Sequence, residues 1–378
     1  MKYYIIAGEA SGDLHGSNLI KALKAKDTTA DIRCWGGDLM QQAGGDLVRH
    51  YKSMAFMGFI EVLANISKIS KNFKFCKADI DAFNPDAIIF IDYSGFNLRI
   101  AKWAKQNNYR TNYYISPQIW ASREGRIKNI KRDIDAMHVI LPFEKDFYEN
   151  KHHYPVHFVG HPLLDAINQK KLPNNAAFRT ANNLGLKKPI IALLPGSRKQ
   201  EVEKMLQIML SVTKTFPEYQ FVIAGAPSLD LDFYEPFLKN PQVGFVANQT
   251  YDLLSLSTAA LVTSGTATLE TALFKVPQVV CYKAHWLSYF IAKQIITLKY
   301  ISLVNLIMDR EVIKELIQSE LTTKNLTSEL KNILADDKRK IMFENYYLLE
   351  KKLGGIGASE KAAALIFTHT ALNNNNTQ

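Results

Sequence analysis

Short apolar runs alternate with longer amphipathic stretches along the chain, and this alternation constrains the fold most. Apolar runs of about four to eight residues are typical of buried strands, and apolar residues spaced three and four apart are typical of helices. Two such series occur. Each begins with an apolar run that leads into a glycine-containing loop, Tyr3–Ala7 in the first series and Ile190–Leu194 in the second. The sequence therefore predicts an α/β protein with two doubly wound, Rossmann-like domains that face a cleft.

The elements of the two series are predicted from the same periodicity. In the first series we expect strands at Tyr3–Ala7, Ala87–Ile91, Thr111–Ile115, Ala136–Leu141 and His157–Val159, and helices at Gly16–Ala25, Ile60–Cys76, Leu98–Asn107 and Glu144–Asn150. In the second we expect strands at Ile190–Leu194, Gln220–Ala224, Leu261–Thr263 and Gln278–Tyr282, and helices from Val202 to Thr215 and from Ala267. The polar segment Asn168–Asn183 is interpreted as a linker. The expected domains are residues 1–165 and 166–344, with a helix at 345–372 that packs back on the first domain.

Composition excludes several classes of protein. With 378 residues, 47% of them hydrophobic and 22% charged, the chain is globular rather than disordered or fibrous. Its net charge of +10 is spread along the sequence, which favours an anionic ligand or surface and disfavours a nucleic-acid-binding arm. The three cysteines are far apart, so neither a disulfide framework nor a paired-cysteine zinc site is expected. No signal peptide or membrane-spanning run is recognisable, and we expect a cytoplasmic protein.

Two loops of the second domain are typical of phosphate-binding sites. Each follows a predicted strand and precedes a helix, where backbone N–H groups and the helix dipole attract anions. The first spans Gly196–Arg198 with Glu201 at the start of the helix, and the second spans Ser264–Glu270. The Arg198 guanidinium suits phosphate oxygens, and the Glu270 carboxylate could accept ribose hydroxyl groups. Together the loops predict a site for a diphosphate with a pendant group, although each loop alone could be a simple helix cap.

Asp92 is the strongest candidate for a catalytic group. It ends the strand Ala87–Ile91, and open α/β sheets bind ligands at the carboxyl ends of their strands. A carboxylate there can act as a general base or can cap the next helix, and both interpretations stay open. His15 is a rival base. It lies in the first loop, Gly8–Gly16, whose glycine spacing matches neither the dinucleotide fingerprint nor the Walker A motif.

Metal binding is not expected from the acidic and histidine-containing patterns. Three Asp-x-Asp pairs resemble the metal clamp of some sugar transferases, but each lies in a polar approach to another element; they begin at Asp79, Asp133 and Asp230. Three histidines recur at the four-residue spacing of helical zinc ligands, at positions 153, 157 and 161, but Pro155 argues against the helix that this site would need.

The segment Ser53–Leu63 is unusually apolar, and the helix predicted after it carries Lys68, Lys71, Lys74 and Lys77 away from its apolar stripe. One interpretation is a core helix with a solvated face. The other is an interfacial surface for an acyl-chain substrate, with the lysines near anionic headgroups. The basic stretch Arg123–Arg132 could do similar work.

Seven short motifs, in this order along the chain, together resemble the lipid-A-disaccharide synthase family: Gly8–Asp13, Met57–Leu63, Ser116–Ala121, Leu141–Glu144, Gly160–Pro162, Leu194–Arg198 and Ser264–Glu270. The resemblance runs from the first strand to about residue 320. It implies an inverting GT-B glycosyltransferase that joins UDP-2,3-diacylglucosamine to 2,3-diacylglucosamine 1-phosphate (lipid X) and releases UDP. It also implies contact with the anionic inner membrane from the cytoplasmic side, and it leaves a homodimer open.

The resemblance places the catalytic aspartate at Asp92 and implies no metal or cofactor. The nucleotide-sugar site is expected at Gly196, Ser197, Arg198, Glu201, Ser264, Gly265, Thr266, Ala267, Thr268, Glu270 and Asn305. The acceptor side of the cleft is expected at Glu9, Ser11, Gly12, Asp13, Met57, Glu61 and Gln118.

The chain departs from the family pattern at three positions. Gly95 stands where an acid is expected, Ser122 where an aromatic residue is common, and Val304 where Pro usually precedes Asn305. Gly95 puts in doubt a second carboxylate role near Asp92. Two other functions stay open at this point. A non-hydrolysing UDP-sugar epimerase would share the second domain, and a non-catalytic nucleotide-binding module would share its loops.

Overall fold

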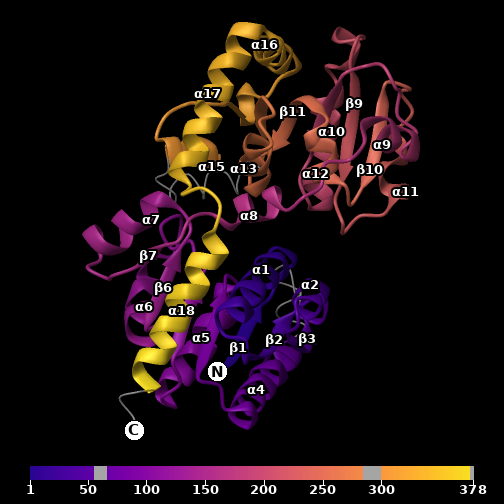
Figure 1. The fold of residues 1–378 in the computed structure, drawn as a ribbon. Coiled ribbons are helices and arrows are strands. Elements are labelled where there is room, and N and C mark those ends of the chain that lie inside the picture. Colours follow the sequence, from indigo (N-terminus) through magenta and orange to yellow (C-terminus); the bar gives the residue numbers. More distant parts are fainter. Residues whose placement is uncertain (55–65, 284–298, 375–378) are drawn as a thin grey trace. The chain divides into compact units, whose positions relative to one another are not determined.

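The computed structural model describes residues 1–54, 66–283 and 299–374. By contact it divides into two compact units, Met1–Asn168 with Leu353–Gln378, and Gln169–Lys352. Both units are built on parallel sheets (Figure 1). None of the helices within the described ranges combines the length and the apolar character needed to span a bilayer.

The first unit contains a seven-stranded sheet in the order β3-β2-β1-β4-β5-β6-β7. All neighbouring strands are parallel; they are β1 (Lys2–Ala7), β2 (Asp31–Gly36), β3 (Asp46–His50), β4 (Ala87–Ile91), β5 (Thr111–Tyr114), β6 (Ala136–Val139) and β7 (His157–Phe158). The central strands β1 and β4 are almost wholly buried, as their apolar sequences require.

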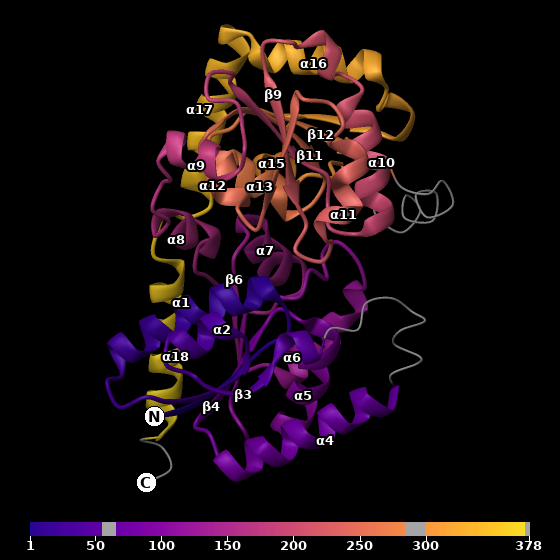
Figure 2. The ribbon, with the colours of Figure 1, turned by 90° about the vertical axis from the view of Figure 1, so that its right-hand side faces the viewer.

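Helices cover both faces of this sheet: α1 (Ala10–Lys26), α2 (Asp38–Gln42), α4 (Ile66–Phe83), α5 (Ser94–Gln106), α6 (Ile127–Asp133), α7 (Pro142–Asp146), α8 (Pro162–Asn168) and α18 (Ala358–Asn374). Figure 2 shows α4, α5 and α6 along one side and α1 with α18 along the other. Alternate strand residues such as Ile6 and Phe90 join Ile80, Ile100 and Ile130 of the first helix group in one buried cluster.

The second unit contains a six-stranded parallel sheet in the order β10-β9-β8-β11-β12-β13. Its strands are β8 (Ile190–Leu194), β9 (Gln220–Gly225), β10 (Val243–Ala247), β11 (Ser257–Thr263), β12 (Gln278–Tyr282) and β13 (Lys314–Ile317). Its helices are α9 (Asn175–Ala181), α10 (Lys199–Leu210), α11 (Leu231–Tyr234), α12 (Thr250–Ser255), α13 (Thr266–Leu273), α15 (Leu303–Met308), α16 (Thr323–Leu334) and α17 (Asp336–Lys352). The two-sheet α/β architecture predicted from the sequence is confirmed.

The strand order reverses at one point in each sheet, between β1 and β4 in the first unit and between β8 and β11 in the second. At such a point the connections leave in opposite directions, so the carboxyl ends of the two strands are open to a ligand. Asp92 follows β4 in the first unit. The two predicted phosphate-binding loops follow β8 and β11 in the second unit. The switch points of the two sheets therefore lie at the same segments that the sequence motifs indicated.

Four strands were not predicted from the sequence, namely β2, β3, β10 and β13. Three of them, β3, β10 and β13, lie at the edge of a sheet, and in β2, β3 and β13 charged residues interrupt the apolar pattern. In β2, the guanidinium of Arg33 forms ion pairs with Asp46 (3.0 Å) and Asp79 (2.7 Å). Partners far along the chain thus compensate for a residue that is uncommon in a buried strand.

The segment interpreted as a linker contains a helix, and the segment expected to form the last helix contains two. The segment Asn168–Asn183 contains α9, which begins after Asn174, whose side chain accepts a hydrogen bond from the Ala177 N–H (3.0 Å). The predicted helix 345–372 is two helices, α17 in the second unit and α18 in the first. Gly354, Gly355 and Gly357 separate them with φ values of 89°, 69° and 100°, which end the helix because other residues rarely adopt them.

The return of the chain to the first unit depends on Asp165. Its carboxylate accepts hydrogen bonds from the backbone N–H groups of Gly357 (2.6 Å) and Ser359 (2.8 Å) at the start of α18. A carboxylate at a helix N-terminus satisfies free N–H groups and interacts favourably with the helix dipole. Gly160 contacts the segment between α17 and α18. A Cβ on Gly160 would lie 3.1 Å from the Leu353 carbonyl oxygen, which accepts from the His161 N–H (2.9 Å).

Candidate active site

The two loops at the switch point of the second unit form one pocket of about 290 Å³. Eight of the predicted nucleotide-sugar residues line it: Gly196, Ser197, Glu201, Ser264, Gly265, Thr266, Ala267 and Glu270. The loop after β9 and the start of α12 complete the lining, with Ala224–Pro227 and Thr250. Sequence reasoning missed this third wall. The glycine and proline that follow the predicted strand Gln220–Ala224 were the available signal.

Gly196 has a backbone conformation that favours glycine. Its φ is 101°, and a Cβ at this position would lie 2.4 Å from Oε2 of Glu201. Gly265 in the second loop also has a positive φ, 149°, but a Cβ there would meet nothing within 4 Å. At these two glycines the pocket wall is backbone rather than side chain, which suits an anion-binding site at helix N-termini.

Glu270 supplies one of the carboxylates of this pocket, which Glu201 also lines. Burial raises the pKa of Glu270, while a hydrogen bond from the Tyr251 hydroxyl to Oε1 (2.8 Å) favours its ionised form. The structure gives Oε2 no partner among the described residues. A carboxylate with one occupied oxygen is fixed in orientation and can still accept a hydrogen bond from a ligand hydroxyl group.

Three predicted nucleotide-sugar residues do not line the pocket. Arg198 is exposed at the N-terminus of α10. Thr268 is fully buried, and its hydroxyl donates to the Gly265 carbonyl oxygen (2.8 Å). Asn305 is also fully buried, and its amide group makes hydrogen bonds to Ile313 and Glu315. In contrast to the expectation, Thr268 and Asn305 use their side chains within the fold.

Asp92 stands in a strained turn at the switch point of the first unit. Asp92 and Tyr93 have φ values of 43° and 47°, a conformation that costs free energy for residues other than glycine. The Asp92 carbonyl oxygen accepts hydrogen bonds from the Asn97 side chain (2.8 Å) and from the Tyr113 hydroxyl, which hold the turn. Strain that neighbouring groups enforce in this way is typical of functional sites.

The Asp92 side chain faces a cavity of about 350 Å³, which is also lined by Ser94, Pro117, Gln118, Ile119, Ser122, Arg123 and Arg126. Burial, and secondarily the negative charge of Glu9, raise the pKa of Asp92 to about 6. The rival base His15 does not line this cavity. It is 7% exposed, and burial lowers its pKa to about 4. Of these two candidate bases, Asp92 has the pKa nearer to neutral pH.

The first loop, Gly8–Gly16, contains exposed residues and buried residues that hold neighbouring elements. Glu9 and Ser11 are exposed where α1 begins. Gly12 lies against β1, because a Cβ there would be 3.0 Å from the Ala7 Cβ. The buried Asp13 carboxylate accepts from the N–H groups of Gly37 (2.8 Å), Leu39 (3.2 Å) and Met40 (2.9 Å), so it caps α2. Among the predicted acceptor-side residues, Gln118 lines the Asp92 cavity, and Met57 and Glu61 lie outside the described residues.

Glu144 joins two of the sequence motifs. It is 1% exposed, and its carboxylate accepts from the Ser116 hydroxyl (2.6 Å), the Trp120 indole N–H (3.3 Å) and two backbone N–H groups. Those N–H groups belong to Ile140 and Leu141. Burial raises the pKa of Glu144, and these hydrogen bonds act in the opposite direction. The carboxylate thereby positions the Ser116–Ala121 loop, which carries Gln118 into the cavity beside Asp92.

Several acids of the Asp-x-Asp pairs have organic cations as partners. Asp79 binds Arg33, and Asp133 binds Arg132 with a Nε–Oδ1 distance of 2.6 Å. Asp135 is paired with Lys105. Among the described residues no group of three or more His, Cys, Asp or Glu side chains is arranged to hold a metal ion.

Comparison with known proteins decides the family. A family model described as lipid-A-disaccharide synthetase matches residues 3–366. This chain belongs to the lipid-A-disaccharide synthase family. The chain is 37% identical over 371 residues to the synthase of Trichlorobacter lovleyi, with 96% of each chain covered. It is 39% identical over 334 residues to the synthase of Coxiella burnetii (strain CbuK_Q154), with 87% of this chain and 88% of that protein covered. The predicted family, a glycosyltransferase family of lipid A biosynthesis, is confirmed.

Solved structures with similar folds include UDP-GlcNAc 2-epimerases. The enzyme from Neisseria meningitidis, bound to UDP-GlcNAc, has a TM-score of 0.64 and 14% identity, and covers 99% of this chain and 100% of that chain. The enzyme from Methanocaldococcus jannaschii has a TM-score of 0.62 and 14% identity, with 98% and 100% covered. At this identity the likeness concerns the fold alone, and it confirms the predicted GT-B class.

Proposed function

We propose that this chain transfers the diacylglucosamine group of UDP-2,3-diacylglucosamine to the 6-hydroxyl of lipid X and releases UDP. The observation that carries the proposal is the Asp92 carboxyl, with a pKa near 6, in a cavity at the switch point of the first unit. The pocket at the switch point of the second unit supports it, because that pocket offers two helix N-termini and a carboxylate to one ligand.

Asp92 acts as the general base. Its carboxylate takes the proton of the 6-hydroxyl while that oxygen attacks the anomeric carbon, and the bond between this carbon and the UDP oxygen breaks. Attack from the face opposite UDP inverts an α-linked donor to a β-1′,6 bond. A pKa of about 6 leaves the group mostly ionised at neutral pH and makes it a stronger base than an ordinary aspartate.

The second unit binds the nucleotide and stabilises the departing diphosphate. Backbone N–H groups at Gly196–Arg198 and Ser264–Ala267 are placed to meet phosphate oxygens, and the exposed Arg198 adds a guanidinium. Glu270 accepts ribose hydroxyl groups through the oxygen that Tyr251 leaves free. Thr268 and Asn305 act indirectly, by holding the Gly265 turn and the 302–315 loop. In this proposal no metal ion takes part.

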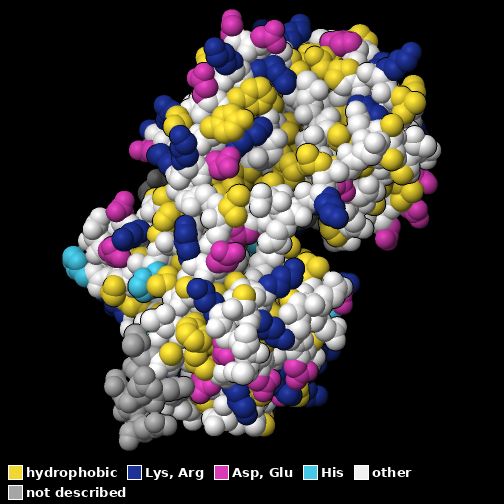
Figure 3. Space-filling view, viewed as in Figure 1, with side chains coloured by type: hydrophobic (Ala, Val, Ile, Leu, Met, Phe, Trp, Pro, Cys, Tyr) yellow, Lys and Arg dark blue, Asp and Glu magenta, His cyan; other side chains and the backbone are white. Residues whose placement is uncertain are grey.

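The enzyme reaches its acylated substrates at the cytoplasmic surface of an anionic membrane. Lys68, Lys71 and Lys74 of α4 are exposed, and lysines near anionic headgroups are attracted to them. The apolar residues Met57, Phe59 and Leu63 precede this helix in the sequence, in the part of the chain that is not described. On the face drawn in Figure 3, Lys and Arg side chains are scattered among Asp and Glu, so they form no single basic stripe for a nucleic acid.

Product analysis by mass spectrometry tests the proposal. The purified protein is incubated with UDP-2,3-diacylglucosamine alone, and then with lipid X added. We expect a disaccharide 1-phosphate and UDP only when both substrates are present. A C2-epimerised UDP-sugar formed from the donor alone would instead establish an epimerase. Binding of UDP without any product would establish a nucleotide-binding module.

A further inference from the structure

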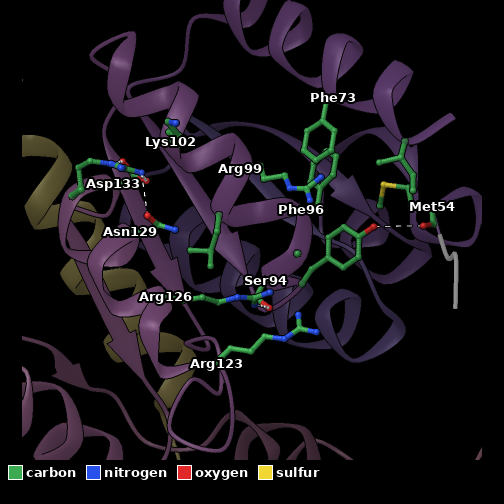
Figure 4. Close-up of a pocket in the computed structure, with 15 residues that line it drawn as sticks. Met54, Phe73, Ser94, Phe96, Arg99, Lys102, Arg123, Arg126, Asn129 and Asp133 are labelled. Carbon is green, nitrogen blue, oxygen red and sulfur yellow. Dashed lines mark hydrogen bonds and ion pairs between the residues drawn. The ribbon is translucent and has the colours of Figure 1, made fainter. Parts of the chain in front are cut away.

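A larger pocket, of about 580 Å³, adjoins the Asp92 cavity in the first unit (Figure 4). Ser94, Arg123 and Arg126 line both, so the two spaces share a wall. The larger pocket has two chemically different sides. One side carries apolar groups, chiefly Met54, Phe73 and Phe96, and the other carries Arg123 and Arg126; the Arg99 guanidinium lies against the apolar side, 5.6 Å from the centroid of the Phe73 ring. We call this space the amphipathic pocket.

No free carboxylate is found among the described residues that line the cationic side. The acid among its described lining residues, Asp133, is already bound by Arg132. The Arg126 guanidinium donates to the neutral Ser94 hydroxyl (3.0 Å). Burial, and then the charges of Arg123 and Arg99, lower the pKa of Arg126. Guanidinium groups that oppose one another's charge in this way are stabilised by an anion, and a phosphate offers the oxygens that they bind best.

The backbone brings two of these arginines to the same side. Arg123 has φ 61° and ψ 41°, a left-handed conformation that is unfavourable for arginine, and it precedes the 3₁₀ turn Glu124–Arg126. Arg123 and Arg126 line the same two cavities, so their side chains share a common space. Figure 4 shows both guanidinium groups near Ser94, directly after the Asp92–Tyr93 turn.

The apolar side is a continuous stack of rings. Phe73 of α4 lies on Phe96 with ring centroids 4.5 Å apart and planes 15° apart, and Phe96 lies on Tyr93 at 5.6 Å. Met54 is buried beside them, whereas Phe73 is only half-buried and lines the pocket. Such a wall removes hydrocarbon from water but offers no hydrogen bonds along its length, which suits an acyl chain.

Gly95 contributes no charge to the lining of the pocket. It lines the pocket where the family resemblance leads us to expect an acid, and a Cβ there would meet nothing within 4 Å. Packing therefore does not demand glycine. Its effect is to leave the guanidinium groups without a neighbouring carboxylate.

We propose that the amphipathic pocket binds the acceptor, with its phosphomonoester on Arg123 and Arg126 and an acyl chain on the Phe73–Phe96 wall. This inference rests on the proposed function, because it places the acceptor sugar between the arginines and the Asp92 base. It also gives the enzyme a means of telling its substrates apart. Donor and acceptor carry the same acylated sugar, and only the acceptor carries a terminal phosphate of two negative charges.

Two acceptors that differ only in the phosphate test the arginines. Initial rates are measured with short-chain 2,3-diacylglucosamine 1-phosphate and with its 1-hydroxyl analogue, for the parent and for Arg123→Gln/Arg126→Gln. Loss of charged hydrogen bonds should raise KM for the phosphorylated acceptor about 10–100-fold. KM for the analogue and for the donor should change less than about threefold. Lys128→Gln, which removes an exposed charge from α6 outside the pocket, is the matched control.

Gly95 offers a second, charge-only test. Gly95→Asp should raise KM for the phosphorylated acceptor several-fold, and Gly95→Asn, which has the same shape without the charge, should not. For the apolar side, Phe73→Ala should raise KM for long-chain acceptors and leave an acetylated, phosphorylated acceptor unaffected. Thermal unfolding of every variant separates these effects from loss of the fold.

The outcomes distinguish this inference from the proposed function. If the parent forms no disaccharide with either acceptor, the proposed function fails. If the parent forms disaccharide and the double arginine variant slows both acceptors equally, the phosphate is bound elsewhere. The arginines would serve the bilayer instead if the double variant lost binding to phosphatidylglycerol vesicles while its KM for the short-chain phosphorylated acceptor stayed at the parent value.

Discussion

Asp92 and Glu9 follow two neighbouring parallel strands, and burial of the Asp92 carboxyl together with the negative charge of Glu9 raises the Asp92 pKa to about 6. A base must be ionised to act, so kcat/KM should rise with pH through about 6 and then level off. Glu9→Gln removes a charge that opposes ionisation, so this rise should move to lower pH. Asp31→Asn is the control, because Asp31 begins the strand β2 beside β1 and so lies at the edge of the sheet opposite to the one where Glu9 and Asp92 lie. An unshifted profile in Glu9→Gln would remove Glu9 from the electrostatics of the site.

Replacing Asp92 tests its role as the base. Asp92→Asn keeps the shape but cannot accept a proton, so turnover should fall by about 10²–10⁴-fold. Calorimetric titration should show unchanged affinity for UDP, because the nucleotide pocket lies in the other unit. Near-parent turnover would move the base assignment to another residue.

The same substitution should alter stability with a definite sign. The pKa of Asp92 is raised in the folded chain above its ordinary value of 3.8, so ionisation is less favourable in the folded than in the unfolded state. Its contribution to stability is complete below pH 4 and is lost as pH rises through about 6. Asp92→Asn removes this loss. The change in unfolding free energy that the substitution causes should therefore be more favourable at pH 8 than at pH 4, by on the order of 2 kcal/mol. Denaturant unfolding at the two pH values measures the difference.

Glu144 should be a structural residue rather than a catalytic one. Glu144→Ala leaves the Ser116 hydroxyl and two backbone N–H groups buried without their acceptor. The cost should be about 3–5 kcal/mol of unfolding free energy, measured by chemical denaturation. Asp146→Ala, exposed on the same helix, should cost less than about 1 kcal/mol. Equal stabilities of the two variants would contradict the role assigned to the Glu144 carboxylate.

Chelators should leave activity largely intact, because helix N-termini and Arg198 are proposed to take the place of a metal ion at the diphosphate. Arg198→Ala should weaken UDP binding about 10-fold, since a charge-assisted hydrogen bond is lost. Activity assays with EDTA and calorimetry with UDP check both statements. Inactivation by EDTA with recovery on adding Mg²⁺ or Mn²⁺ would show that a metal ion takes part in the reaction.

Membrane attachment should depend on the apolar segment before α4 and on its lysines. Replacing Met57, Phe59 and Leu63 with Ser should weaken binding to anionic vesicles and raise the apparent KM for lipid substrates, with UDP affinity unchanged. High salt should weaken vesicle binding of the parent only in part, because apolar contacts are not screened. If the triple variant unfolds, these side chains belong to the core. If it binds vesicles as the parent does, the lipid surface lies elsewhere, and Trp286–Phe290, also outside the described residues, is the next candidate.

The sequence by itself determined the α/β class, the central strands and the loops of both switch points, because short-range patterns encode them. An apolar run such as Ile190–Leu194 has to be buried on both faces, and a glycine loop before a helix has to leave N–H groups free. The sequence also indicated Asp92 as a functional residue, because Asp92 is a charged residue at the carboxyl end of a buried strand, where open α/β sheets bind ligands.

Only the tertiary structure decided which partners these residues meet. Thr268 and Asn305 were expected in the nucleotide-sugar site, yet their side chains make their hydrogen bonds within the fold. The strand β2 and the crossing at Asp165 depend on ion pairs and caps between residues far apart in sequence, which no local pattern reveals. For the same reason the raised pKa of Asp92 and the opposed charges of Arg123 and Arg126 follow from burial and proximity, which exist only after the chain has folded.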